Sequence, residues 1–242
     1  MYLRALVTIL ATVAVSLAVA VETAQDAAQH LRAMLVDDTT HYVAAMGGIA
    51  ANNISAIMAT EYFAPCFQDA HNGDLLFLAL TVSEQWRLAL SPNRTTTVSV
   101  HNSPDMSVVD VRHARQSAAG RQVWQAERPM WRRGMASKGR ATMYGTMHAL
   151  APDTKGLDDL AQCFTAHHPD ADAWTPHAHG NPHSAVWVRF EPTRIYYVGG
   201  FGDEHYIGDI DVDTYRAAKL GLHNDADTAN ALYIQSSIYD SV

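Results

Sequence analysis

The chain has 242 residues, with 17 Lys+Arg against 25 Asp+Glu and a formal net charge of −8. This length can supply a substantial hydrophobic core, and 48% hydrophobic with only 17% charged residues excludes a disordered polyelectrolyte. The acidic balance argues against nucleic acid as the main partner. Two cysteines cannot build a disulfide-dense miniprotein or a four-cysteine zinc site.

The N-terminus has the pattern of a secretory signal peptide. Arg4 precedes an uncharged apolar run, Ala5–Ala20, which ends in the small-x-small sequence Ala18-Val19-Ala20. The run is shorter than the ~20 residues that a membrane span needs. We therefore expect residues 1–20 to be removed in the secretory pathway, leaving a mature chain without a membrane span.

Two N-x-S/T sequons remain in the expected mature chain. They are Asn53-Ile54-Ser55 and Asn93-Arg94-Thr95. In the secretory lumen such sequons mark surface positions that accept glycans. We therefore expect glycosylation at Asn53 and Asn93.

The two cysteines, Cys66 and Cys163, can oxidise in the same compartment. A bridge between them would close a loop of about a hundred residues, worth roughly 4–5 kcal/mol in the chain-entropy model. The alternative is two separate buried thiols. Both remain open, because the sequence does not give the distance between the two Cα atoms.

Hydrophobic periodicity predicts mostly strands with a few short helices. In chain order we expect a helix at 24–35, strands at 42–49, 55–62 and 74–80, a helix at 83–90, strands at 95–101 and 140–150, a helix at 157–164, strands at 185–190 and 194–198, and a helix from 213 to 220. The last two strands would meet in a turn around Pro192, and the last helix would end at Gly221. This pattern indicates a closed or sandwiched antiparallel sheet with peripheral helices.

A basic segment interrupts this pattern at residues 105–140. It carries a net charge of +5, so the rest of the chain carries −13. Its periodicity is poor, which indicates a long loop or insertion. The segment is either a solvated mobile loop or a basic flap over an anionic ligand or the acidic face of a partner.

The motif search excludes several kinds of site. There is no H-E-x-x-H, G-x-S-x-G or C-x-x-C motif, and the glycine-rich run at 199–202 is followed by Asp203 and Glu204, where a phosphate would need positive charge. His177, His179 and His183 could place three imidazoles near one metal ion. The alternative is ordinary solvated or hydrogen-bonded histidines. His167 and His168, near a predicted helix C-terminus, are explained by a favourable interaction with the helix dipole.

The C-terminal half contains a series of residues that occur in this order in one family. The series is His168-Pro169, Trp174, Pro176, His183, Trp187, Phe190, the run from Arg194 to Gly202, and Tyr215. The upstream segments Gly73–Leu80 and Tyr144-Gly145-Thr146 agree with it. The chain resembles the CREG ("cellular repressor") glycoproteins, a secreted branch of the pyridoxamine-phosphate-oxidase-like FMN-binding split-barrel superfamily.

This resemblance implies a mainly β fold with peripheral helices, a six-stranded split β-barrel over residues 21–222 that forms a homodimer. The insertion at 105–137 and a tail at 223–242 fall outside the resemblance. Flavin-binding relatives hold FMN at the dimer interface, with phosphate ligands before and within the helix that here spans 83–90. The matching positions are Thr81, Ser83 and Arg87, whereas Glu84 and Trp86 fit a phosphate site poorly.

CREG-type members resemble the fold without the flavin. We therefore expect a glycoprotein, extracellular or in an endolysosomal or vacuolar lumen, with no catalytic residues and no cofactor, that binds a protein or glycan-receptor partner. An alternative is an FMN-dependent oxidoreductase on the same fold, in which the flavin would carry out the redox chemistry. A weaker alternative is a haem- or metal-handling protein that uses the histidine-rich loop.

Overall fold

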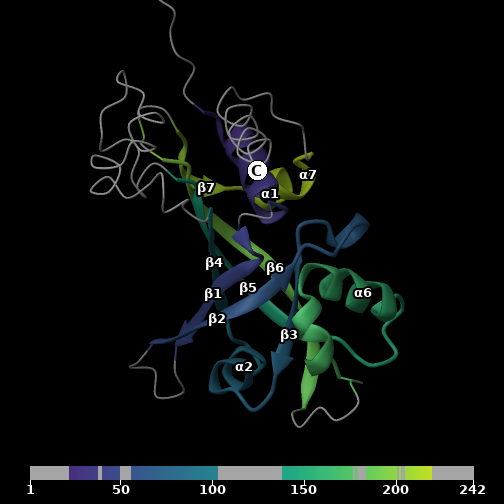
Figure 1. The fold of residues 1–242 in the computed structure, drawn as a ribbon. Helices are drawn as coiled ribbons and strands as arrows, with labels where there is room; N and C mark the ends of the chain where they lie inside the picture. Colours follow the sequence, from purple (N-terminus) through teal and green to yellow (C-terminus); the bar gives the residue numbers. More distant parts are fainter. Residues whose placement is uncertain are drawn as a thin grey trace, which may run out of the picture.

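The fold is an antiparallel barrel with helices at its two ends and on one flank (Figure 1). The computed structural model describes residues 22–37, 40–49, 56–102, 138–176, 178, 184–200, 202 and 205–219. The predicted signal peptide, the insertion at 105–137 and the tail at 223–242 therefore lie outside the described residues.

Six strands form the barrel, and a seventh extends it. They are β1 (Val43–Ile49), β2 (Ala56–Ala64), β3 (Leu75–Leu80), β4 (Thr96–His101), β5 (Arg140–Ala149), β6 (Ala185–Val198) and β7 (Ile207–Ile210). Their order is β3-β2-β1-β4-β5-β6-β7, and pairing between β3 and β6 closes the six-stranded ring. β2 and β3 are paired only at two positions, Phe63 with Phe77 and Ala64 with Leu76. The expected closed antiparallel sheet is confirmed.

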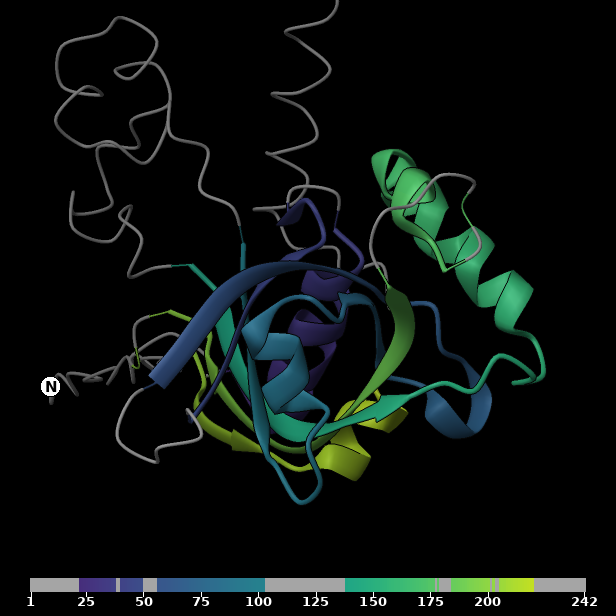
Figure 2. The same ribbon diagram turned by 90° about the horizontal axis from the view of Figure 1, so that it is seen from below.

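Helix α1 (Ala24–Leu35) covers one end of the barrel, and α2 (Glu84–Ala89) lies at the other (Figures 1 and 2). α1 begins in a capping box, in which the Thr23 side chain accepts from the Asp26 N–H and the Asp26 carboxylate accepts from the Thr23 N–H. Its apolar stripe, with Leu31 and Leu35, is buried in the barrel core. On α2, Trp86 is buried from the opposite end and packs edge-on against Phe77.

The region around Pro192 differs from the prediction. Instead of two strands and a turn, β6 is one continuous strand of 14 residues. The register against β5 shifts between Tyr144 and Gly145, so that Tyr144 faces Arg194 and Gly145 faces Pro192. Thr193 is left as the extra residue of a bulge, and bulges are among the few places where a sheet accepts proline. The prediction of a turn was wrong because the bulge removes the need for a ladder hydrogen bond at this proline.

The C-terminal helix also differs from the prediction. Helix α7 (Val212–Ala217) ends before Gly221, and its C-cap residue Ala218 is already extended. Ala218 is buried in the main core, so burying this side chain ends the helix earlier than the glycine signal indicates. The four-residue strand β7 before α7 was not predicted, because a single Ile-Gly-Asp-Ile run is too short to show a period.

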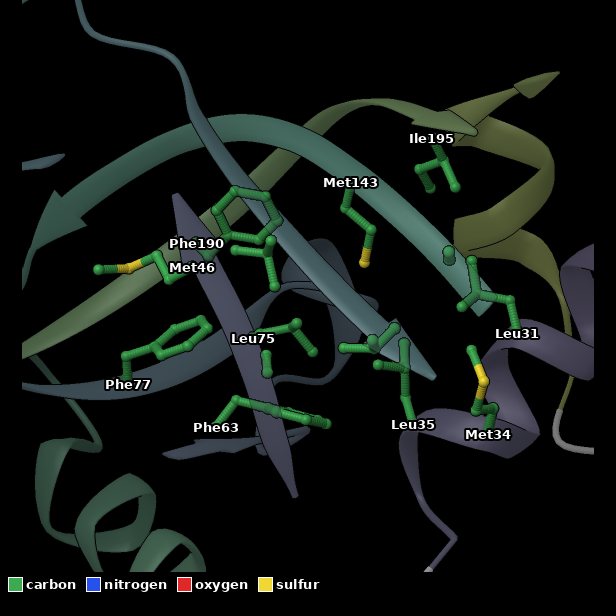
Figure 3. Packing of buried hydrophobic residues seen from close by; sticks show 14 of the residues in the cluster. Leu31, Met34, Leu35, Met46, Phe63, Leu75, Phe77, Met143, Phe190 and Ile195 are labelled. Carbon is green, nitrogen blue, oxygen red and sulfur yellow. The ribbon is translucent and has the colours of Figure 1, made fainter. Parts of the chain in front are cut away.

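Two hydrophobic clusters hold the domain together. The main one fills the barrel with side chains from its strands and end helices (Figure 3). The second lies on the outside of the wall, where α6 (Leu157–His167) and the 3₁₀ helix η5 (Pro169–Trp174) pack against β2 and β3. Phe164 and Trp187 meet edge-to-face in this second cluster. A disulfide joins Cys66, just after β2, to Cys163 of α6, and thereby ties the flanking helix to the barrel.

A buried carboxylate connects four parts of the fold. The Asp74 side chain has no exposed surface and lies 2.9 Å from an Arg189 nitrogen of β6 and 2.7 Å from an Arg216 nitrogen of α7. Burial raises the pKa of Asp74, and the two guanidinium groups act in the opposite direction. Beside it, Arg32 of α1 donates to the Asn72 side chain. The loop before β3 is thereby fixed to α1, β6 and α7.

Candidate functional site

The predicted phosphate ligands Thr81, Ser83 and Arg87 lie before and within α2, and two of them, Thr81 and Arg87, donate hydrogen bonds to backbone carbonyl oxygens of the chain itself. The Thr81 hydroxyl donates to the Ser184 carbonyl oxygen at 3.1 Å. Arg87 folds back and donates to the Val82 carbonyl oxygen at 2.5 Å. Ser83 is the N-cap residue of α2, and its side chain makes no capping hydrogen bond.

Beside this segment, a shallow hollow of about 10 Å³ lies between α2 and the ends of β1 and β4. That volume has room for about one water molecule and is far below that of a pocket for a drug-sized ligand. Arg94 is the only basic side chain in its lining, which is otherwise mostly aliphatic or glycine; the lining residues are Met46, Gly47, Gly48, Ile49, Ile57, Gln85, Leu88, Ala89, Arg94, Thr95 and Thr96. Gln85 in that wall donates to Glu61 at 2.7 Å.

The outer surface of β1, β2, β4 and β5 carries no Asp, Glu, Lys or Arg at its central positions. We call this set the outer face; by strand register its residues are Val43, Ala45, Gly47, Ile49, Ala56, Met58, Thr60, Tyr62, Thr97, Ser99, Thr142 and Tyr144. Three large apolar side chains are exposed on it, Ile49 at 53%, Met58 at 70% and Tyr62 at 42%. A contiguous exposed surface of this composition is typical of a protein contact surface.

Tyr62, at one corner of the outer face, is held rigidly. Its ring stacks on His168 with centroids 4.1 Å apart, and its hydroxyl donates to Asp170 at 3.2 Å. His168 is buried, and its Nε2–H donates to the Phe63 carbonyl oxygen at 2.9 Å.

Burial lowers the pKa of His168 and so disfavours the cation that a helix-dipole interaction requires. The dipole explanation is therefore wrong for His168. Its function is to join the end of α6 to β2 and to support the Tyr62 ring.

The other predicted sites have different outcomes. Asn93 is exposed at the turn between α2 and β4, with a left-handed φ of 58° that asparagine tolerates well. Asn53, His177, His179 and His183 lie outside the described residues. Within the described part of the chain, no group of three or more His, Cys, Asp or Glu could hold a metal ion. No described helix is long and apolar enough to cross a membrane.

Sequence reasoning missed the outer face. The segment 56–62 of β2 is apolar or small at almost every position, so its alternation does not separate an inner from an outer side. The sequence signal that could have identified the outer face is the absence of charged residues at the central outward positions of β1, β2, β4 and β5. This signal can be recognised only when the order and register of the four strands are known.

A six-stranded antiparallel barrel closed between β3 and β6 and covered by end helices defines the class of split-barrel proteins. A family model described as "CREG, beta-barrel" matches residues 22–217. The chain therefore belongs to the CREG β-barrel family. No curated protein matches the sequence.

Solved structures similar to this chain include three bacterial proteins. The heme binding protein from Mycobacterium smegmatis is 14% identical, with a TM-score of 0.52, over 80% of this chain and 61% of that one. ChuZ from Campylobacter jejuni is 14% identical, with a TM-score of 0.49, over 77% and 59%. A protein related to general stress protein 26, of the pyridoxinephosphate oxidase family, from Clostridium acetobutylicum is 9% identical, with a TM-score of 0.44, over 77% and 96%. At these identities the similarity shows the fold alone.

Proposed function

We propose that this CREG-family chain is a secreted, glycosylated, non-catalytic protein that acts by binding, as a homodimer, to a protein or glycan-receptor partner. The proposal that the protein is non-catalytic is supported mainly by the hydrogen bonds that the predicted phosphate ligands make. Thr81 and Arg87 are engaged by backbone carbonyl oxygens of the chain itself. A phosphate would have to replace the Thr81 contact, and it would have to bind Arg87 through the guanidinium N–H groups that do not face the Val82 carbonyl oxygen.

The local charge also opposes a flavin phosphate. Glu84 stands in the first turn of α2, directly after the Ser83 cap, where a carboxylate occupies the favourable end of the helix dipole and repels a second anion. α2 has only six residues, so its N-terminus adds little compensating attraction. The described residues around α2 do not fit the FMN phosphate, and we derive no flavin chemistry for this chain.

A melting experiment tests this proposal against its two alternatives. We expect added FMN and added haemin each to leave the Tm of the purified protein unchanged. A bound ligand at 100 times its Kd would stabilise the fold by about 2.7 kcal/mol and raise the Tm. A rise with FMN that is lost in Arg87→Ala would establish the flavin site instead. A rise with haemin would establish haem handling and overturn the cofactor-free proposal.

The outer face supports the homodimer. It has exposed apolar side chains at Ile49 and Met58 and lacks charges at its centre, the composition of an interface core. A two-fold axis through such a surface pairs it with itself without opposing like charges. The heme binding protein and pyridoxinephosphate oxidase relatives share the fold, but the argument for the dimer rests on this chain's own surface.

Met58→Glu should weaken the dimer. A carboxylate buried at the most exposed apolar position of the outer face would cost several kcal/mol, so we expect the dimer Kd to rise by about 100-fold or more in analytical ultracentrifugation. The matched control is Val82→Glu, because Val82 is 62% exposed but lies outside the outer face. A monomeric wild-type protein, or a Met58→Glu dimer as tight as the wild type, would refute this interface.

Glycosylation at Asn93 is a further expected result of the secretory route. Protein secreted from a eukaryotic host should lose mass on glycosidase treatment, and Asn93→Gln should remove one glycan. Because Asn93 is exposed with left-handed φ, the substitution should cost about 1–2 kcal/mol in strain. No mass shift in the wild type would contradict both the Asn93 and the Asn53 assignments.

A further inference from the structure

The end of the barrel that faces α1 contains a buried carboxylate between two histidines. The Glu22 side chain is 6% exposed. One of its oxygens accepts from Nδ1 of His30, on α1, and the other lies 3.4 Å from Nδ1 of His205, in the turn between β6 and β7. The same second oxygen accepts the backbone N–H of Tyr206 at 2.8 Å. We call these four residues the Glu22 cluster.

The cluster connects the start of the described chain to a turn far away in sequence. The turn closes on itself through the Gly199 N–H, which donates to the Tyr206 carbonyl oxygen at 2.9 Å. Gly199 lies directly against the cluster: a Cβ atom there would stand 2.6 Å from a Glu22 oxygen and 3.0 Å from the His205 Cβ. A larger residue at this position would therefore displace the Glu22 carboxylate and crowd the His205 side chain.

The titratable groups that face the Glu22 carboxylate among the described residues are few. They are His30 of α1, Tyr197 of β6, and His205 of the turn, and no described Lys, Arg or second carboxylate is among the groups that act on it. Burial beside Glu22 raises the pKa of Tyr197 far above neutral, so this phenol stays uncharged. Histidine is the residue type whose charge ordinarily changes between pH 5 and 8, and two histidines contact this carboxylate.

We propose that the Glu22 cluster is a pH-dependent latch that holds the β6–β7 turn against α1 more firmly at mildly acidic pH than at neutral pH. With neutral imidazoles, the buried carboxylate keeps only hydrogen bonds. With protonated imidazoles, the buried carboxylate also gains two cations at close range, on side chains that are 28% (His30) and 40% (His205) exposed. The latch does not depend on the proposed binding function.

The lower limit of the latch follows from Glu22 itself. Burial alone would raise its pKa, but the hydrogen bonds from His30 and Tyr206 and the charges of both histidines outweigh burial and lower the pKa below 4.5. The carboxylate therefore contributes its stabilisation above about pH 4.5 and loses it as the pH falls through the lowered value. As the pH rises and the imidazoles lose their protons, the carboxylate keeps only its hydrogen bonds and the latch loosens.

Hydrogen exchange of the mature chain tests the proposal, with the N-terminus acetylated so that no α-amino group next to Glu22 titrates between the two pH values. After correction for intrinsic rates, we expect the Gly199 and Tyr206 amides of the wild type to be about two- to fivefold better protected near pH 5.5 than near pH 8, the range expected of a partly exposed ion pair. Glu22→Gln should remove this difference. Amides of β4, remote from the cluster, report any change in global stability, and His101→Asn, at an exposed histidine without a carboxylate partner in the described structure, is the matched control.

His205→Asn provides a second test, because His205 is 40% exposed at its side chain and its replacement should leave the fold intact. It should reduce the pH-dependent protection even if Glu22→Gln fails to fold. Equal protection of the wild-type turn at both pH values overturns the latch. So does a pH-dependent protection that survives in both variants.

Discussion

Asp74→Ala is expected to lower the free energy of unfolding by about 3–5 kcal/mol, the usual cost of removing one partner from a buried ion pair. The Asp74 carboxylate is fully buried. Its removal would leave Arg216, 23% exposed, without the carboxylate that it contacts at 2.7 Å. It would leave Arg189, 16% exposed, with the more distant Glu191 carboxylate at 3.8 Å. The loss of stability should extend from the loop before β3 to α7, because Asn72 and Gly73 of this loop also bind α7. The Asn72 side chain donates to the Arg216 carbonyl oxygen, and the Tyr215 hydroxyl donates to the Gly73 carbonyl oxygen.

Urea unfolding at neutral pH measures this effect. Asp153→Ala is the matched control, since Asp153 is an exposed turn residue, and its removal should change the free energy of unfolding by less than about 0.5 kcal/mol. A cost for Asp74→Ala as small as that of the control would show that the ion pairs of Asp74 with Arg189 and Arg216 contribute nothing to stability.

Removing the disulfide is expected to have a similar effect. Cys66 and Cys163 are 97 residues apart in sequence, and a cross-link of that span stabilises the folded state by roughly 4–5 kcal/mol in the chain-entropy model. The double variant Cys66→Ser/Cys163→Ser should therefore unfold at much lower urea concentration. The loss should be largest for α6, whose contacts with the wall depend on the small cluster around Phe164 and Trp187.

Reductant provides the internal control. It should lower the stability of the wild type towards that of the double variant and leave the double variant unchanged. A double variant within about 1 kcal/mol of the oxidised wild type would contradict the expected contribution of the bridge.

Much of the fold could be predicted from the sequence, because local periodicity and family resemblance agree. α1 and five of the barrel strands lie close to their predicted ranges, since their apolar residues repeat at the helical or strand period. β6 was divided at Pro192 because proline normally interrupts a ladder, and only the register against Gly145 shows the bulge that accommodates it.

The site was less predictable, because its contacts join distant parts of the chain. Thr81 and Arg87 are residue types that commonly bind phosphate. Whether the Thr81 hydroxyl and the Arg87 guanidinium are free to do so depends on the positions of the Ser184 and Val82 carbonyl oxygens, which the sequence does not give. The connection of Glu22 to Tyr206 spans 184 positions. Whether Cys66 meets Cys163 depended on the docking of α6, which no local pattern encodes.

The visible absorbance spectrum of the natively purified protein tests most directly whether this CREG-family split barrel acts without a flavin. We predict a colourless protein with no flavin bands, because Thr81 and Arg87 are bonded to the backbone and Glu84 repels a phosphate. A yellow protein that releases FMN on denaturation would contradict the account and identify the fold as a working flavin site.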